Sequence, residues 1–426
     1  MKGLTIKIQT LLICGVLITG LFSSCASDEN VETGIKVNPG DKVLTLTLNT
    51  PKTTTSGAKT RATNMTQADI TTKGTENQIN RLTIGIFSSD GNTVRTIQEL
   101  SSGTTSPSFS TSGATTTATL VTNSLAAGDK VLVAANAPTG TFNGCTTASS
   151  FQSKAIAIDV ALTTPATGTA DITKEATDNL PMYGDATTNT SVSDNGVIVA
   201  PVSPSTTYTA KVEVQHQVAK ITLSSLTVAF DQTGPYKSAT FQPTSFFLLN
   251  VPQTLSFSND ASTGSTDFLH GWAAADGTTT PTVRTFKKYL GTDIFSTSYS
   301  AMSGTITINP NNVFYTIPNS NTTTNTKLVI GGEFDADGSG TSASPTTVYY
   351  PVNINWVYDK TKTPVEGPAE SGSVAKQVYP NKNYSCKVTI KTKGATSPSD
   401  KIDPEAASIT VTVLPFTPVP QDTSFE

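Results

Sequence analysis

The sequence predicts an all-β protein made of β-sandwich domains, and three observations lead to this prediction. Short runs in which apolar and polar residues alternate recur along the chain, and each is bounded by Gly, Pro or Asn. No convincing long helix pattern is present, and strands do not alternate with helices as they do in parallel α/β sheets. Charged residues make up only 14% of the chain whereas Thr, Ser and Gly are abundant, a composition typical of secreted β proteins.

The length and charge of the chain limit the classes of function. At 426 residues the chain is too long for one ordinary core, so two or three domains are expected. The formal net charge is −4 and no basic stripe is present. Nucleic acid is therefore excluded as a partner, because its binding depends on clustered positive charge.

The N-terminus has the features of an export signal. Lys2 and Lys7 precede an apolar run over residues 11–22, which is followed by two serines and Cys25. A cysteine directly after small residues at the cleavage point is typical of bacterial lipoproteins, in which its thiol is acylated. We predict that residues 1–25 are a lipoprotein signal peptide that ends at the lipidated Cys25. The alternative is ordinary signal cleavage beside an incidental cysteine.

The first predicted strand stands just before a segment open to proteases. From Val43 to Leu48 leucine and threonine alternate, so the side chains of Leu44, Leu46 and Leu48 share one apolar face. Small polar residues then run to Arg61, and they cannot bury a core. Two interpretations follow: an edge strand before a linker, or a removable strand that cleavage after Arg61 or Lys59 releases. The second makes residues 26–61 a propeptide.

The strands that follow can be placed in order along the chain. Residues 81–97 predict a hairpin around an Asp-Gly turn, and the apolar run 131–136 predicts a central strand. Residues 151–162 fit either a short helix or a strand. A Pro/Ser-rich stretch ends near Thr206, and there we place the boundary between two domains. The predicted domains are an N-terminal sandwich over 62–206 and a C-terminal sandwich over 207–406.

The C-terminal extension, residues 407–426, contains a second strand of the same pattern. Ile409, Val411 and Val413 fall on one face, as the three leucines near the N-terminus do, and Phe416 follows. If the N-terminal strand leaves, it opens a groove bounded by unpaired strand edges. This C-terminal strand from another copy could fill that groove by strand addition.

No catalytic, metal or cofactor site is predicted. The two histidines, His216 and His270, have no metal-ligand spacing, and no nucleophile, phosphate-loop or C-x-x-C motif occurs. Residues 335–340 imitate the start of a calcium loop, but a hairpin turn explains them better. Further expectations are a core position for Trp356, a candidate ligand contact at Trp272, and separate thiols at Cys145 and Cys386.

Several segments together resemble the fimbrillins, the subunits of type V pili of Bacteroidetes. The resemblance is carried by the lipoprotein signal ending at Cys25 and by motifs in a specific order along nearly the whole chain. These motifs are Lys59-Thr60-Arg61-Ala62, Ile79 to Phe87, Leu180-Pro181-Met182-Tyr183-Gly184, Val218-Ala219-Lys220-Ile221, Tyr315 to Asn319, and Tyr379 to Phe416.

The resemblance implies a fold and an assembly route. It implies two transthyretin-like β-sandwich domains in tandem, a lipoprotein precursor at the cell outer membrane, and cleavage between Arg61 and Ala62 by a trypsin-like protease. It implies polymerisation into an extracellular fimbrium by donor-strand exchange, with Ile409, Val411, Val413 and Phe416 as donor residues. The expected partners are other copies, related pilus subunits and, before processing, the membrane. The alternatives are a monomeric surface lipoprotein that binds glycan or host protein, and, less expected, a secreted hydrolase.

Overall fold

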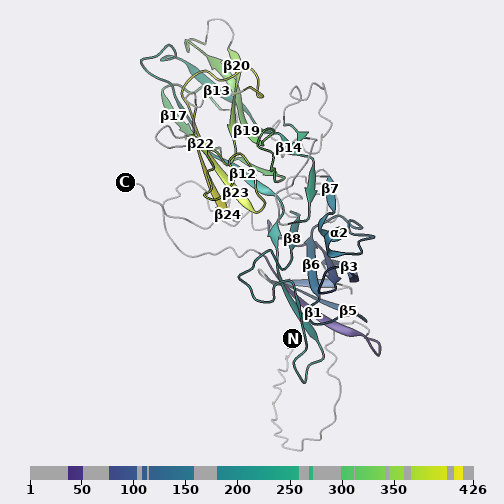
Figure 1. Cartoon of the computed structure of the whole chain (residues 1–426). Helices are drawn as coiled ribbons and strands as arrows, with labels where there is room; N and C mark the ends of the chain where they lie inside the picture. The colour runs from purple at the N-terminus through teal and green to yellow at the C-terminus, as the bar shows by residue number, and fades with distance from the viewer. Residues whose placement is uncertain are drawn as a thin grey trace, which may run out of the picture. The chain divides into compact units, whose positions relative to one another are not determined.

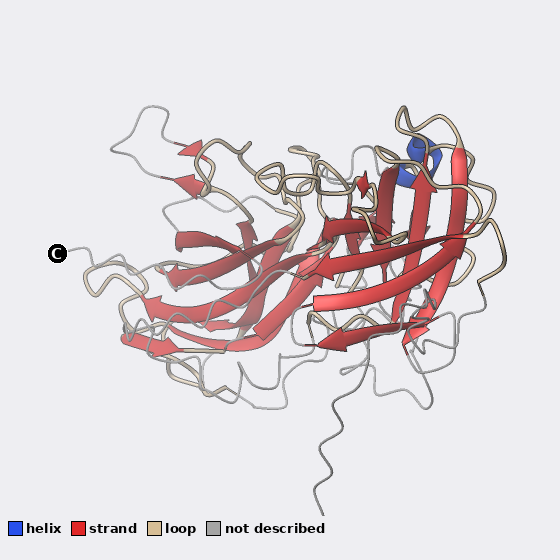
Figure 2. Ribbon diagram, turned by 90° about the horizontal axis from the view of Figure 1, so that it is seen from below, coloured by secondary structure: helices blue, strands red, loops and turns tan. Residues whose placement is uncertain are grey.

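In the computed structural model the regular secondary structure of the described residues is almost entirely β-strand, which confirms the predicted all-β fold class (Figure 2). It describes residues 37–50, 76–102, 108–112, 115–157, 180–258, 268–271, 299–310, 312–340, 345–358, 366–400 and 407–415. Among these residues the single helix is α2 (Ala148–Gln152), capped by the Thr147 side chain, which accepts a hydrogen bond from the Ser150 backbone N–H. No helix within these ranges is long and apolar enough to span a membrane.

A ten-stranded sheet contains the first half of the described chain. In the order in which they lie side by side, its strands are β11 (Gln215–His216), β8 (Met182–Gly184), β6 (Lys130–Ala135), β2 (Arg81–Phe87), β3 (Val94–Ser102), β4 (Ser108–Ser112), β5 (Thr115–Thr122), β1 (Lys42–Asn49), β10 (Tyr208–Glu213) and β9 (Ile198–Val199). The predicted hairpin is β2 and β3, and the predicted central strand is β6, which pairs with β2 and β8.

This sheet folds over so that β9, at one end of the strand order, meets β6, the third strand from the other end. The Val131 N–H donates to the Gly196 carbonyl at 2.8 Å, and the Ile198 N–H donates to the Asp129 carbonyl at 2.9 Å. Both bonds join the start of β6 to the segment around β9, at the far end of the strand order. Apolar side chains from both halves pack in a single cluster, which includes Leu46, Ile84, Leu120, Val133 and Val212. The sheet is therefore a closed sandwich with its apolar face inside.

Two further sheets share a second core. One has the order β17 (Thr305–Ile308), β12 (Ala219–Ala229), β23 (Lys382–Ile390) and β24 (Ala407–Pro415), and β18 (Asn312–Thr316) also pairs with β12. The other contains β13 (Thr240–Leu249), β19 (Lys327–Asp335) and β20 (Thr346–Asn353). The remaining short strands are β7 (Ala155–Ala157), β14 (Val251–Pro252), β15 (Thr254–Ser256), β16 (Phe268–Leu269), β21 (Val357–Tyr358) and β22 (Glu366–Gly367).

The change from the first sheet to the next falls between His216 and Ala219. The domain boundary near Thr206 stays a prediction. The same holds for the division of the chain into residues 1–25, 26–61, 62–206, 207–406 and 407–426. Strands β19 and β20 pair in the antiparallel sense, and residues 336–340 begin the connection between them, which agrees with the predicted hairpin. Cys145 and Cys386 are both buried and free, so the expectation of separate thiols is confirmed. Trp356 is 5% exposed and therefore a core residue, while Trp272 lies outside the described residues.

A buried ion pair connects the segment before β2 to the second set of sheets. The Lys220 ammonium lies 2.8 Å from the Glu76 carboxylate, and the side chains of both residues are almost fully buried. The Tyr315 hydroxyl donates to the same carboxylate oxygen. The ring of His216 is also buried, and its Nε2 lies 2.9 Å from the Glu76 carbonyl oxygen. His216 therefore has a structural role.

Candidate functional site

The strand β1 is an interior strand with a neighbour on each side, and Figure 1 shows it beside one of them, β5. It pairs with β5 in the antiparallel sense, from Lys42 opposite Thr122 to Asn49 opposite Thr115. It pairs with β10 in the parallel sense, from Leu44 beside Tyr208 to Asn49 beside Glu213. The edge-strand interpretation of this segment is therefore wrong, because both of its backbone edges are hydrogen-bonded.

The leucines of β1 fill the centre of the first core. Leu44, Leu46 and Leu48 are each 0% exposed and belong to the same cluster as Ile84 and Val133. Strand alternation places the threonines between them on the opposite face, where they are only half-buried. If β1 is withdrawn, its place becomes a slot, defined here as the space between β5 and β10 together with the apolar floor beneath it. Both walls of that slot would then be unpaired strand edges.

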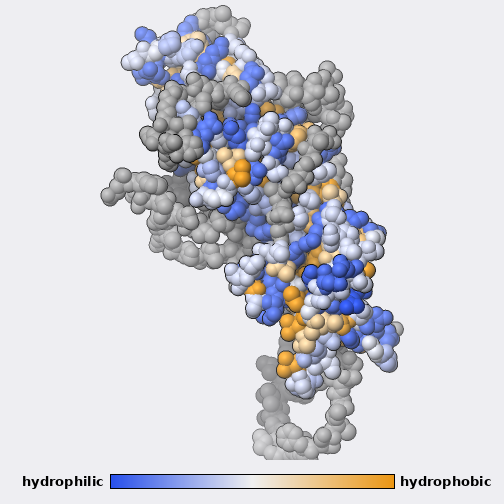
Figure 3. All heavy atoms as spheres, in the orientation of Figure 1, coloured by the Kyte–Doolittle hydropathy of each residue, from blue (hydrophilic) through white to orange (hydrophobic). Residues whose placement is uncertain are grey.

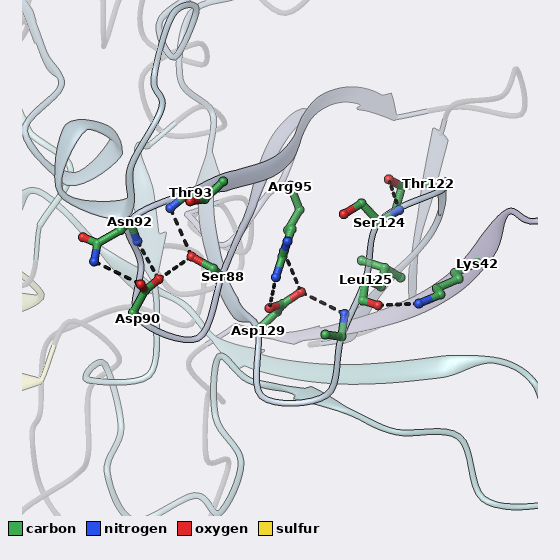
Figure 4. A network of polar contacts seen from close by, with 11 residues as sticks. Lys42, Ser88, Asp90, Asn92, Thr93, Arg95, Thr122, Ser124, Leu125 and Asp129 are labelled. Carbon is green, nitrogen blue, oxygen red and sulfur yellow. Dashed lines mark hydrogen bonds and ion pairs between the residues drawn. The ribbon is translucent and has the colours of Figure 1, made fainter.

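One polar contact holds the start of β1 (Figure 4). The Lys42 ammonium donates a hydrogen bond to the Leu125 carbonyl at 2.7 Å and lies 5.5 Å from the centre of the Tyr208 ring. Asp129 fixes the loop that presents this carbonyl, since it accepts hydrogen bonds from the Ala126 N–H at 2.9 Å and from Arg95 Nε at 3.2 Å. We call the Leu125 carbonyl and the Tyr208 ring the cation subsite. It is built by the loop that contains Leu125 and by β10, and no residue of β1 contributes to it.

A second polar contact holds the other end. The Asn49 side-chain amide donates to the Glu213 carboxylate at 2.9 Å, and the Val214 N–H donates to the Asn49 carbonyl at 3.0 Å. Asn49 and Glu213 lie side by side in the parallel ladder. Sequence reasoning missed both polar contacts, because the partners of Lys42 and Asn49 stand 83 and 164 residues away in the chain.

The predicted donor segment forms β24 at the end of a sheet. It pairs with β23 in the antiparallel sense, and this places Ile409 opposite Val388, Val411 opposite Cys386, and Val413 opposite Tyr384. Val411 is buried in the second core. Burial raises the pKa of the Cys386 thiol to about 12, so this thiol is protonated at neutral pH. The structure thus places β1 and β24 in separate sheets and does not bring the two strands together.

Four predicted site residues lie outside the described residues, namely Cys25, Arg61, Ala62 and Phe416. Within the described residues, no group of three or more His, Cys, Asp or Glu side chains could hold a metal ion. On the face drawn in Figure 3, apolar residues form small scattered patches among polar ones. The slot of β1 is therefore the feature that best supports a functional interpretation.

Part of the sequence matches a known protein family. The family model of the major fimbrial subunit protein (FimA) matches residues 43–224, the part of the chain that begins in β1 and ends in β12. This match confirms the likeness to fimbrillins predicted from the sequence. No curated protein sequence matches the chain significantly.

Solved structures share the fold over almost the whole chain. A fimbrilin (FimA) from Porphyromonas gingivalis W83 is 15% identical with a TM-score of 0.53, covering 89% of this chain and 99% of its own. A candidate cell adhesion protein from Parabacteroides distasonis is 14% identical with a TM-score of 0.56, covering 90% and 100%. Another from Bacteroides eggerthii is 16% identical with a TM-score of 0.51, covering 88% and 96%. At these identities the likeness shows the fold.

Proposed function

With residues 43–224 matching the major fimbrial subunit family, we propose that this protein is a structural subunit of a surface pilus and has no catalytic role. It is exported as a lipoprotein acylated at Cys25 and held at the outer membrane. A trypsin-like protease then cuts between Arg61 and Ala62, and the subunit joins a fimbrium stalk that supports adhesion. The observation that carries this proposal is the interior position of β1, whose removal opens a slot along the first core.

The residues of β24 provide an occupant for the slot. With Ile409 at the position of Leu44, the side chains of Val411 and Val413 take the places of Leu46 and Leu48. Thr410 and Thr412 then fall on the half-buried face, as Thr45 and Thr47 do now. The incoming strand, which comes from another copy or a related subunit, runs parallel to β10 and antiparallel to β5, because that is the polarity of β1.

The energetics explain why cleavage is needed. Burying three leucine side chains contributes roughly 2–3 kcal/mol each, an upper estimate of about 6–9 kcal/mol. While β1 is tethered, its effective concentration at the slot is on the order of millimolar, so an incoming strand cannot compete. Cutting the tether removes this advantage without changing any contact of β1. Exchange is then governed by dissociation of the cleaved strand and by the concentration of donors.

The experiment compares the unaltered chain, a truncated chain and a doubly substituted chain after protease treatment, on a denaturing gel without heating. We expect a ladder of polymers from the unaltered chain, with Ala62 as the first residue on N-terminal sequencing. Truncation before Ala407, or the double change Arg61→Ala with Lys59→Ala, is expected to abolish the ladder. The proposal fails if the truncated chain still polymerises. A single band with Cys25 acylated and no cleavage favours a monomeric lipoprotein instead.

A further inference from the structure

The two ends of β1 bear polar contacts that this chain's own β24 cannot reproduce. With Ile409 in the place of Leu44, the methyl group of Ala407 takes the position of the Lys42 side chain. At the other end, Leu414 takes the position of Asn49. The replacement strand therefore offers no cation to the Leu125 carbonyl and the Tyr208 ring, and no amide to Glu213.

Shifting the register does not repair this mismatch. A shift of one residue turns every apolar side chain of β24 to the wrong face. A shift of two residues places Glu405 or Ile409 at the position of Lys42, and neither side chain is a cation. In all three registers the cation subsite stays unfilled, and the Leu125 carbonyl loses its hydrogen bond.

The cation subsite is held in place without β1. Its carbonyl belongs to a loop fixed by the Arg95–Asp129 ion pair, in which the Asp129 side chain is 2% exposed. The same loop is bonded to the neighbourhood of β9 by the Gly128 N–H, which donates to the Ile198 carbonyl at 2.9 Å. Tyr208 belongs to β10 and packs against the first core. The subsite is therefore preorganised, and preorganised partners favour a ligand that matches them.

We infer that the polar ends of the slot determine which strand it accepts. They select a strand that carries a cation two residues before its first buried apolar side chain and an amide one residue after its last. The tethered β1 has both features and β24 has neither. The slot therefore binds β1 more tightly than it binds the chain's own C-terminal strand. This inference rests on the proposed function, since it concerns the same slot. It identifies Lys42 and Asn49 as the residues that, in addition to the tether, slow the release of β1 from the slot.

The same contacts define the chemistry of a preferred partner. A related subunit whose terminal strand has Lys or Arg and Asn or Gln at these two positions would bind more tightly than a second copy of this chain. Each charged hydrogen bond of this kind changes the affinity by about tenfold. The two ends stand roughly 20 Å apart along an eight-residue strand, so their effects should add to about a hundredfold.

The test measures how long labelled peptides stay bound to the full-length chain cut by trypsin. The peptides are residues 38–50, the same peptide with Lys42→Ala or Asn49→Leu, residues 403–416, and that second peptide with Ala407→Lys and Leu414→Asn. Lys42→Ala or Asn49→Leu in the first peptide is expected to shorten the half-life of its complex about tenfold. Ala407→Lys together with Leu414→Asn is expected to lengthen the half-life of the second peptide's complex about a hundredfold. Thr45→Ala, on the half-buried face, is the matched control and is expected to change it less than twofold.

The outcomes separate this inference from the proposed function. If the peptide of residues 403–416 binds but the substitutions leave the half-lives of both peptides within twofold, the inference is wrong. The proposal of strand exchange is not affected by that result. If it does not bind whereas the first peptide binds in a Lys42-dependent way, strand exchange is wrong and the inference stands. A second measurement uses the uncut chain, where Lys42→Met with Asn49→Leu should speed hydrogen exchange in β5 and β10. Unchanged exchange there, together with no peptide binding, overturns the inference.

Discussion

Replacing Leu46 by alanine gives the largest perturbation of the slot that a single side chain allows. Leu46 is 0% exposed, and its two ladder neighbours are Ala118 in β5 and Ala210 in β10. Neither alanine can extend into the space that the lost isobutyl group leaves. Buried Leu→Ala changes cost about 2–5 kcal/mol, depending on how well the site can collapse. Because this site is flanked by alanines, we expect a cost near 4 kcal/mol.

Hydrogen exchange of the β5 and β10 amides is the appropriate assay, since a chain with several cores need not unfold in one step. A loss of about 4 kcal/mol corresponds to roughly a thousandfold faster exchange where opening passes through release of β1. The control is Thr47→Ala on the opposite, half-buried face, with an expected cost of about 0.5 kcal/mol or less. A change of less than about tenfold for Leu46→Ala would refute the assignment of β1 as the main filling of this core.

Three other perturbations test parts of the structure outside the slot. Lys220→Ala leaves the buried Glu76 carboxylate without its cation and is expected to cost about 3–5 kcal/mol in chemical denaturation, against less than about 1 kcal/mol for the more exposed Lys382→Ala; equal effects would contradict the burial of this pair. Cys386 should resist thiol reagents at neutral pH and react at least about tenfold faster after truncation before Ala407, because β24 covers it; an unchanged rate would argue against that pairing. Burial lowers the pKa of His216, so the unfolded chain binds a proton that the folded chain does not, and the free energy of unfolding should fall as pH drops below about 6.5. His216→Gln should flatten that part of the pH profile, and a profile that keeps its slope would refute the role of this histidine.

The sequence predicts the strands of this protein better than it predicts their neighbours. Alternation of leucine and threonine is enough to identify β1 as half-buried and to group Leu44, Leu46 and Leu48 on one face. The same reasoning finds β24 and the hairpin of β2 and β3. The strands that pair with β1 cannot be identified in this way, because β10 begins at Tyr208, more than 150 residues beyond the end of β1. Local periodicity contains no information on contacts at that separation.

The polar contacts at the two ends of the slot could not be predicted from local sequence patterns either. Nothing in the residues around Lys42 indicates that its ammonium meets the Leu125 carbonyl and the Tyr208 ring. Asn49 is equally unremarkable in sequence, although it contacts Glu213. An apolar pattern is repeated along a strand and can be recognised, whereas a single polar contact across the sheet is not repeated. The strand-exchange hypothesis could therefore be formed from the sequence, but its specificity could not.

The central claim is that β24 of one copy takes the place of β1 in another, and a cross-link between copies tests it most directly. Thr45 pairs with Thr119 of β5, and Thr410 takes the place of Thr45 in the proposed register. Copies carrying Thr410→Cys and Thr119→Cys, cut after Arg61 and oxidised, are expected to form a covalent ladder that persists after heating. Thr410→Cys with Ala118→Cys is the control, because position 118 faces the core. A heat-resistant ladder with the control pair alone, or with neither pair while polymers still form, would contradict the account.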